Sequence, residues 1–273
     1  MRALRAFCLA AATFLAACAA PFDPEDLTVD VPARSQVAGV PLIQQADFYC
    51  GPASIAMVMQ WAGAEVTQAD VAALSFNPGA EGTYLADMLG ASRRLGQLAV
   101  TIDGFDQLLA EVDAGHPVIV FQNLGVGVFP VWHYGVVTGY DLGVEEVYLN
   151  SGQLDQMVMD LPAFARTWAR GENWGLVVLP PDRLPASVAE AEVLRAGAAL
   201  ERVGQYAAAE ALYQTGAARW PENWLWPFGL GNARYARGDL RGAQSALQQA
   251  RRLGPDVPEV RANLATVTRE ITG

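Results

Sequence analysis

The sequence predicts an α+β domain followed by an all-α region, and three patterns lead to this prediction. Segments with the periodicity of helices come first, and segments typical of strands follow, as in an α+β domain built on an antiparallel sheet. A proline-rich stretch at residues 180–185 then interrupts the chain. Beyond it, the sequence is rich in alanine, and small residues recur 34 positions apart, which indicates a helical repeat.

The helices of the first domain are expected near its start. Pro52 suits the first turn of a helix that begins at Cys50, because its missing N–H would have no partner there, and Gly63 ends this helix. Thr67 and Asp70 have the spacing of a cap for a second helix. We therefore expect helices over residues 50–62, 67–74, 84–95 and 105–114.

The strands of this domain are expected after its helices, apart from one short strand at the start. Runs rich in β-branched and aromatic residues alternate with turn residues in the second half of the domain. The predicted strands span residues 37–43, 117–122, 131–140, 146–150, 156–160 and 174–179. The domain as a whole is expected to cover residues 37–181.

The repeats of the second region are recognised by three pairs of residues. Gly204, Ala209 and Pro221 recur as Gly238, Ala243 and Pro255. The period resembles that of tetratricopeptide repeats, in which small residues let two helices pack closely. We expect about two repeats and a capping helix within residues 187–273. A plain helical hairpin without a binding role is the alternative.

The resemblance to tetratricopeptide repeats implies a concave surface for a protein partner. We expect Asn232 and Arg195 to line this surface, with Trp224 and Trp226 at its rim. Exposed tryptophan is a common anchor of protein interfaces, although a core role for the two tryptophans is an equal alternative.

The first residues predict an exported protein. Two arginines precede an apolar run at residues 6–17, which is too short to cross a bilayer as a helix. The run ends in small residues before Cys18 and resembles the lipobox of bacterial lipoproteins. This resemblance implies a signal peptide over residues 1–17, a lipid on Cys18 and a tether over residues 18–36. The expected location is the periplasmic side of the outer membrane, and an ordinary signal peptide is the alternative.

Charge and composition exclude several classes of function. The net charge is −11, which argues against a nucleic acid partner, since phosphate contacts need clustered basic groups. None of the 18 basic residues is a lysine, which excludes P-loop and Schiff-base chemistry. Two histidines far apart in the sequence, with one cysteine outside the predicted leader and lipid site, supply a catalytic zinc site poorly. We therefore expect no cofactor and no metal.

Cys50 is the candidate nucleophile. Cys8 lies in the predicted signal peptide and Cys18 at the predicted lipid site, so Cys50 is the one thiol left for chemistry. A cysteine at a helix N-terminus lies at the positive end of the helix dipole, and a nearby imidazole would favour its thiolate further. His133 and His116 are the two candidate bases, and the turn of His116 with Pro117 favours a structural role for His116.

Asn150 and two glutamines complete the candidate site. If the strands on either side of residues 141–143 pair symmetrically, His133 faces Asn150 directly, at a Cβ separation of about 4.5–5.5 Å. Asn150 would then orient the imidazole. The backbone N–H of Cys50 and the amide of Gln44 or Gln45 are candidate donors to an oxyanion.

These residues together resemble a known family. Gln-x-x-x-x-Cys-Gly-Pro-Ala-Ser, followed by His133-Tyr-Gly-Val-Val-Thr-Gly-Tyr-Asp, resembles the double-glycine peptidases, which are papain-like cysteine peptidases that process bacteriocins. The resemblance implies Cys50 as nucleophile, His133 as base, Asn150 as orienting residue and Gln44 or Gln45 as oxyanion donor, acting on a peptide or protein. The alternatives are a non-catalytic papain-fold scaffold and an amidase or acyltransferase that acts on cell-wall peptides.

Overall fold

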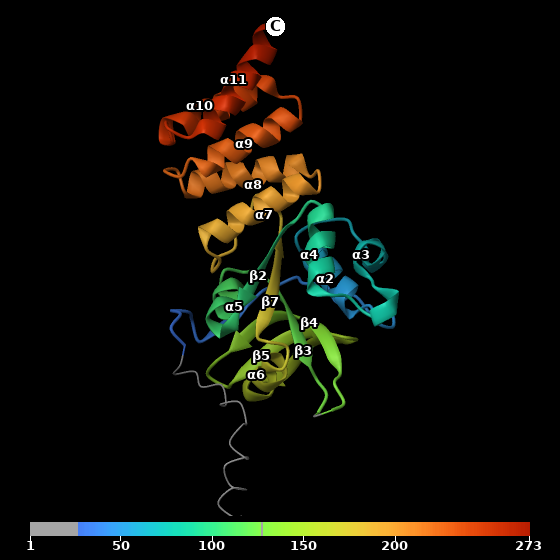
Figure 1. Ribbon diagram of the computed structural model, residues 1–273. Helices are drawn as coiled ribbons and strands as arrows, with labels where there is room; N and C mark the ends of the chain where they lie inside the picture. Colours follow the sequence, from blue (N-terminus) through green and yellow to red (C-terminus); the bar gives the residue numbers. More distant parts are fainter. Residues whose placement is uncertain (1–26, 127) are drawn as a thin grey trace, which may run out of the picture.

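The computed structural model describes residues 27–126 and 128–273 (Figure 1). Its first domain contains a seven-stranded antiparallel sheet with the order β2-β7-β3-β4-β5-β6, and β1 pairs with the far end of β4. The strands are β1 (Arg34–Gln36), β2 (Leu98–Asp103), β3 (Val118–Asn123), β4 (Trp132–Asp141), β5 (Glu146–Ser151), β6 (Leu154–Asp160) and β7 (Trp174–Leu179).

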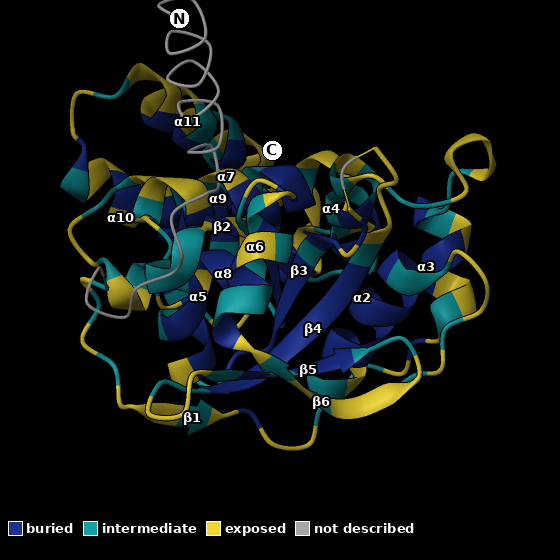
Figure 2. Cartoon of the chain, turned by 90° about the horizontal axis from the view of Figure 1, so that it is seen from below, coloured by how far each residue is buried: buried dark blue, intermediate teal, exposed yellow. Residues whose placement is uncertain are grey.

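Helices cover both faces of this sheet. They are α2 (Cys50–Trp61), α3 (Gln68–Ser75), α4 (Leu85–Arg94), α5 (Gly104–Asp113) and α6 (Leu161–Ala169), with a 3-10 turn η2 (Pro78–Ala80) before α4. Helix α2 packs on one face against β3, β4 and β7, whereas α5 and α6 lie on the other face. The central strands β3 and β4 are accordingly buried over most of their length (Figure 2).

The local signals for the first four helices are confirmed. Helix α2 begins at Cys50, and Gly63, with a φ of 87°, lies just beyond its end. Thr67 and Asp70 form the predicted capping box, in which the Thr67 hydroxyl accepts from the Asp70 N–H and the Asp70 carboxylate accepts from the Thr67 N–H. Reciprocal capping of this kind satisfies two backbone donors that the helix leaves free.

Three elements differ from the prediction. The strand expected at residues 37–43 is wrong, because the chain pairs with β4 earlier, as β1. After the Val37 N–H donates to the Thr138 carbonyl at 2.7 Å, the chain leaves the sheet. Strand β2 and helix α6 were not predicted, and they begin two residues after Gly96 and directly after β6, respectively. The α6 helix starts where the Asp160 carboxylate accepts from the Ala163 N–H at 3.0 Å.

The second region consists of five helices within the described residues. They are α7 (Glu190–Arg202), α8 (Tyr206–Arg219), α9 (Leu225–Ala236), α10 (Leu240–Leu253) and α11 (Pro258–Thr272). Helices α8 and α9, and then α9 and α10, pack closely in sequence order. Gly216 makes the first contact possible, because a Cβ at this position would overlap the ring of Trp226.

Trp226 has the core role that was the alternative to a place at the rim. Its side chain is 0% exposed, its ring stacks on Trp220 at 5.1 Å, and its indole N–H donates to Glu190 at 2.7 Å. A large aromatic ring beside a glycine fills the space between two helices, so Trp226 belongs to the core of the repeats. Trp224 is half-buried.

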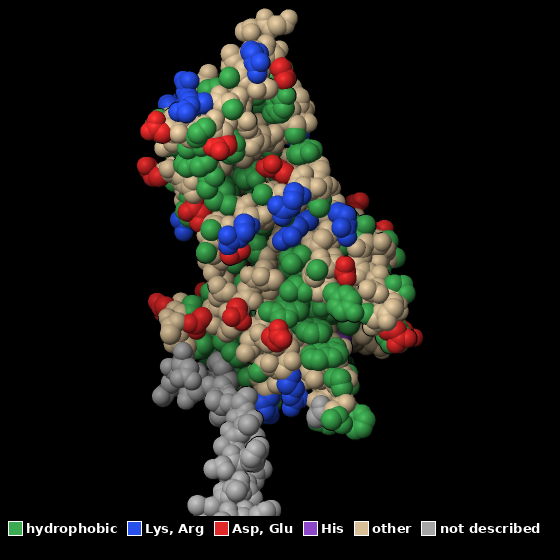
Figure 3. All heavy atoms as spheres, viewed as in Figure 1, with side chains coloured by type: hydrophobic (Ala, Val, Ile, Leu, Met, Phe, Trp, Pro, Cys, Tyr) green, Lys and Arg blue, Asp and Glu red, His purple; other side chains and the backbone are tan. Residues whose placement is uncertain are grey.

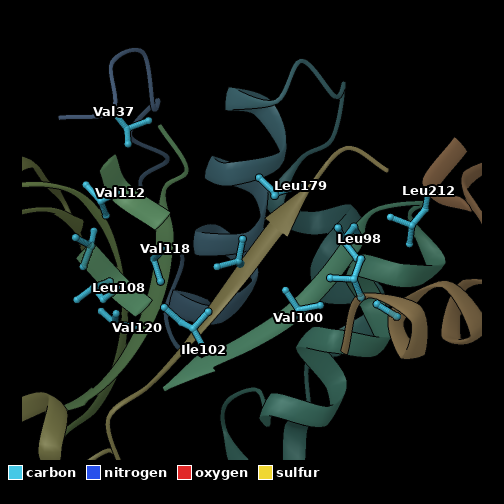
Figure 4. Close-up of a cluster of buried hydrophobic side chains, with 14 of the residues drawn as sticks. Val37, Leu98, Val100, Ile102, Leu108, Val112, Val118, Val120, Leu179 and Leu212 are labelled. Carbon is cyan, nitrogen blue, oxygen red and sulfur yellow. The ribbon is translucent and has the colours of Figure 1, made fainter. Parts of the chain in front are cut away.

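One hydrophobic core runs through both regions. Leu212 of α8 lies near Leu98 and Val100 of β2, as Figure 4 shows, and all three side chains belong to the same buried cluster. Helix α7 contacts both β2 and α4. The repeats are therefore packed against the edge strand of the sheet. No helix in the part of the chain that the structure describes is long and apolar enough to cross a membrane.

Candidate active site

Cys50 is positioned by a loop that is tied to a neighbouring helix. The Gln68 side chain of α3 accepts from the Ala46 N–H at 3.2 Å and donates to the Gln44 carbonyl at 3.0 Å. Phe48 has a φ of 64°, which turns the chain just before the first turn of α2. The loop before the cysteine is thus held at two points by one side chain, and Cys50 follows at the start of α2.

Gly51 lets this first turn approach the sheet. A Cβ at Gly51 would lie 3.0 Å from the Cβ of Thr83 and 3.4 Å from the Tyr134 ring, so any larger residue would push the helix away. The Tyr134 hydroxyl donates to the Thr83 carbonyl at 3.0 Å, which joins β4 to the segment before α4. The N-terminus of α2 is therefore seated against the start of β4.

The electrostatics of Cys50 differ from the prediction. Burial raises the pKa of the Cys50 thiol, and hydrogen bonds from the backbone N–H groups of Tyr134, Gly51 and Cys50 itself lower it in part. The expected preference for the thiolate is therefore not found in this arrangement, because desolvation of the buried thiol is the largest influence on its pKa. The same contacts place the Cys50 sulfur within hydrogen-bond reach of the Tyr134 N–H, and Tyr134 directly follows His133 in the sequence.

His133 is held by a serine. Its Nε2 lies 2.9 Å from the Ser151 hydroxyl, and burial lowers the pKa of the half-buried imidazole. At neutral pH the His133 ring is thus neutral and the Cys50 thiol is protonated. A bond at Nε2 leaves Nδ1 as the ring nitrogen available for proton exchange.

The predicted pairing of His133 with Asn150 is wrong. Asn150 lies opposite Val136 in the sheet, and its buried side chain has other partners. Its amide donates to the Val40 carbonyl at 3.1 Å and to the Pro41 carbonyl at 3.4 Å, while its oxygen accepts from the Gln156 N–H at 3.1 Å. Asn150 therefore anchors the segment that leads towards the glutamines and Cys50.

The register explains this difference. Strand β4 extends to Asp141, and the turn occupies residues 142–145, where Glu145 takes a φ of 56°. A bulge between Val137 and Gly139 then shifts the pairing by one residue. The symmetric pairing expected across residues 141–143 places the centre of the turn about two residues too early, and the bulge reduces this offset only in part. The one sequence signal for Ser151 was its hydroxyl, directly after Asn150.

The two glutamines differ in exposure. Gln44 is exposed, and its carbonyl is bound by Gln68, whereas Gln45 is half-buried. Cys50 is the free cysteine of the described residues, and the backbone N–H of Cys50 faces its own sulfur. Of the two amides, the half-buried one is better placed to act inside a site.

His116 lies away from this site. Its Nδ1 lies 2.7 Å from the Glu111 carboxylate, and both side chains are buried. The other Glu111 oxygen accepts from the Ser187 N–H and hydroxyl, each at 2.7 Å. The expected structural role of His116 is confirmed, because it joins the end of α5 to the segment that leads into the repeats.

A row of aromatic side chains lies beside the candidate site. The Phe121 ring stacks on Trp132 at 5.0 Å and on Trp174 at 5.6 Å, and it packs against Tyr134 at 4.7 Å. Trp132 is 50% exposed, although an isolated aromatic ring of this size is usually buried. These four rings are here called the aromatic row, and Figure 3 shows that hydrophobic side chains gather on the face of the first domain drawn there.

A hairpin tip extends this patch. The Asn123 side chain accepts from the Gly125 and Val131 N–H groups at 3.0 Å each, which fixes the base of the β3–β4 connection. Beyond this base, Val128 and Phe129 are 85% and 74% exposed. A rigid base with an exposed apolar tip is typical of a binding loop.

No group of three or more potential metal ligands exists among the described residues. The site consists of a thiol, an imidazole, amides and backbone donors. A thiol, an imidazole and backbone donors are the groups that nucleophilic acyl transfer uses.

Two family models match the chain. Residues 37–172 match the model of the Peptidase_C39 like family, and residues 200–266 match the model of the tetratricopeptide repeat. The chain thus has a C39-like domain with a peptidase-like fold, followed by a helical region of tetratricopeptide type, and the resemblance seen in the sequence is confirmed. No protein with a curated description matches the chain.

Solved structures similar to the first domain come from the same group. One is described as a C39-like peptidase from Bacillus anthracis, with 21% identity over 54% of this chain and 97% of that one, at a TM-score of 0.46. The peptidase domain of Streptococcus ComA has 23% identity over 52% of this chain and 99% of its own, at a TM-score of 0.44. A double glycine motif protease from an AMS/PCAT transporter has 21% identity over 53% and 93%, at 0.43.

Proposed function

We propose that this protein is a cysteine peptidase in which Cys50 is the nucleophile and His133 the general base. The observation that carries the proposal is the placement of the Cys50 sulfur at the start of α2, against the backbone of Tyr134, with a neutral His133 held by Ser151. Nucleophile, base and orienting group are the three parts that acyl transfer requires.

The reaction follows from these protonation states. His133 takes the thiol proton as the sulfur attacks the carbonyl carbon of the peptide bond. The Cys50 N–H and the Gln45 amide donate to the oxyanion of the tetrahedral intermediate. His133 then gives its proton to the leaving amine, and a thioester remains. A water that loses its proton to His133 releases the acid and restores the thiol.

Asn150 supports this reaction at a distance. It holds the backbone of residues 40–41 through two hydrogen bonds, and this segment continues to Gln44 and Gln45. In this proposal Asn150 is a positioning residue for the oxyanion donors, whereas Ser151 orients the base.

The aromatic row and the hairpin tip supply a surface for the substrate. A polypeptide with apolar side chains would cover Trp132 and Phe129, which solvent now contacts. The substrate class of the proposal is therefore a peptide or an unfolded protein segment.

Trapping the thioester tests the proposed function. A defined library of fluorescent peptides is incubated with the full chain, quenched in acid and analysed by mass spectrometry for an acyl adduct on Cys50. We expect the adduct with the natural chain and its absence with Cys50→Ala. Release of free acids distinguishes a peptidase from a transferase, which would pass the acyl group to an added amine.

One observation favours the non-catalytic alternative. Ser151 is a neutral hydroxyl, so it stabilises an imidazolium less than a carboxylate would. A binding scaffold would bind library peptides without forming an adduct. The same experiment therefore separates the two functions.

We also propose that a lipid on Cys18 anchors the protein to the periplasmic side of the outer membrane. Cys18 and the signal peptide lie outside the described residues, so the proposal rests on the lipobox pattern alone. Labelling with an alkynyl fatty acid should mark the natural chain and leave Cys18→Ser unmarked.

A protein partner on the repeats is the last part of the proposal. Asn232 of α9 and Asn263 of α11 are joined at 2.9 Å and line a pocket of about 120 Å³ with Tyr235 and Leu247. Small polar pockets with an apolar floor are suited to a peptide segment. Asn232→Ala should weaken capture of such a partner and leave hydrolysis of short peptides unchanged.

A further inference from the structure

A pocket lined by arginines lies where the repeats meet the C39-like domain. Its volume is about 250 Å³, and it is formed by α4, β2 and α7. Three arginines line it, namely Arg93 of α4 and Arg195 and Arg202 of α7. We call it the junction pocket. Figure 3 shows basic side chains gathered on this face, at the level where α7 crosses the first domain.

The arginines of the junction pocket are incompletely paired. Arg93 donates to the Ala99 carbonyl at 3.0 Å, but its buried Nε has no hydrogen-bond partner. Burial and the neighbouring charge of Arg202 both lower the pKa of Arg93, so the two guanidinium groups repel each other at short range. A buried donor without a partner and two like charges are each unfavourable.

Two carboxylates stand near these arginines, and neither neutralises the pocket. Glu192 is paired with Arg195 on the same helix. Glu201 is near Arg202, but its carboxylate bonds to Tyr213, and burial raises its pKa. Arg93 and Arg202 therefore keep an excess of positive charge, in a chain whose net charge is −11. An anion in the pocket would satisfy the free Nε and reduce the repulsion.

The junction pocket adjoins a second hollow that reaches the aromatic row. Thr101 and Glu192 line the junction pocket, and they also line the second hollow, which has a volume of about 400 Å³ and includes Trp174. Trp174 belongs to the aromatic row, where it packs near Tyr134 at 6.0 Å. The Tyr134 N–H in turn faces the Cys50 sulfur. A chain that occupies the active site can thus run along the aromatic row and end in the junction pocket.

We propose that the junction pocket binds an acidic side chain of the substrate and so makes the enzyme selective for peptides with Asp or Glu at a fixed distance from the cleaved bond. The inference rests on the proposed peptidase function. A guanidinium cluster suits a carboxylate, because each fork can donate two parallel hydrogen bonds. The repeats thereby complete a substrate site that the first domain lacks alone.

Cleavage profiling of a defined synthetic peptide library tests this inference. The full chain is compared with Arg202→Gln and with Arg252→Gln, a matched control on the exposed end of α10. We expect an enrichment of Asp and Glu at one position of the cleaved peptides. Replacing that residue by Gln should lower kcat/KM about tenfold in the natural chain and in Arg252→Gln, as for the loss of one charge-assisted contact. In Arg202→Gln the two peptides should be cleaved equally.

A charge reversal distinguishes a change in selectivity from a loss of folding. Arg202→Glu should prefer a peptide with Lys at the selected position, which a folding defect cannot produce. Peptides with a free or an amidated C-terminus show whether the carboxylate comes from a side chain or from the chain end, and equal cleavage of both supports the side chain. Cleavage without an acidic preference, or with the same preference in Arg202→Gln, would overturn the inference. The absence of any cleavage would refute the proposed peptidase function instead.

Discussion

The two regions of the molecule use their aromatic residues in opposite ways. In the C39-like domain, Trp132 is 50% exposed and stacks on Phe121 at the surface, beside the candidate site. In the repeats, Trp226 is fully buried and stacks on Trp220 between two helices. The first arrangement leaves apolar surface for a ligand, whereas the second uses the same residue type to hold helices together. Trp132 is therefore the candidate for ligand contact, whereas Trp226 is a core residue.

The two regions also differ in the kinds of side chain that they offer to a ligand. The first domain offers apolar side chains in the aromatic row, and α7 offers arginines in the junction pocket. A substrate that contacts both regions would need apolar and acidic residues. Under the proposal above, the substrate is therefore a peptide that has both kinds of residue.

The largest effect is expected from truncating the two tryptophans. Trp226→Ala should lower the free energy of unfolding by about 3–5 kcal/mol, because a buried ring is lost and a cavity remains between α8 and α9. Trp132→Ala should change stability little and raise the KM for apolar peptides. Urea unfolding and steady-state kinetics of both variants measure the two effects. A raised KM in Trp226→Ala with unchanged stability would contradict the core role of Trp226.

A smaller effect is expected at the link between the regions. Burial alone would raise the pKa of Glu111, but hydrogen bonds from His116 and Ser187 outweigh it, and the pKa is lowered. A carboxyl with a lowered folded pKa adds stability above its unfolded pKa, and this stability is lost as the pH falls through the folded value. Glu111→Gln should therefore lose about 1–3 kcal/mol at pH 7, since a buried donor loses its charged partner.

The pH dependence of unfolding checks this prediction. The natural chain should lose the contribution of Glu111 below pH about 4.5, and the difference from Glu111→Gln should shrink there. A difference that stays constant down to pH 3 would mean that the carboxylate charge plays no part in the link.

The smallest effect is expected from the neighbours Ser151 and Asn150. Ser151→Ala should lower kcat about tenfold and leave the fold intact, because only the orientation of His133 is lost. Ser151→Asp should restore kcat. Asn150→Ala should lower stability by about 1–3 kcal/mol as well as turnover, since two backbone carbonyls and one N–H lose a buried partner. Circular dichroism and steady-state kinetics distinguish the two outcomes.

Local signals in the sequence predicted much of the fold. The capping box at Thr67, the glycines after α2 and α4 and the proline-rich boundary each depend on a few neighbouring residues, so a linear pattern contains them. The 34-residue period revealed the repeats for the same reason. Strand β2 was missed although it contains the β-branched residues Val100, Thr101 and Ile102, which are typical of strands.

The sequence suggested the residue types of the candidate site, but it did not predict all of their contacts. Cys50 and His133 could be singled out as candidates because each residue type is rare in this chain, and their roles stay predictions. The predicted pairing of His133 with Asn150 was wrong, because the turn lies about two residues later than expected and its position is set by pairing across the sheet. Likewise, the acidity of Cys50 depends on burial, which a helix start alone does not reveal.

The modification of Cys50 by an electrophilic peptide tests whether Cys50 is a nucleophile that depends on His133. The rate constant is measured by mass spectrometry from pH 5 to pH 10 for the natural chain, His133→Ala and the control Arg252→Gln. We predict a single adduct on Cys50, an inflection above the ordinary thiol pKa of about 8.5, and a rate at pH 7 that falls about 100-fold in His133→Ala. The control should match the natural chain. An equal rate in His133→Ala, or no adduct at any pH, would contradict a peptidase built on Cys50 and His133.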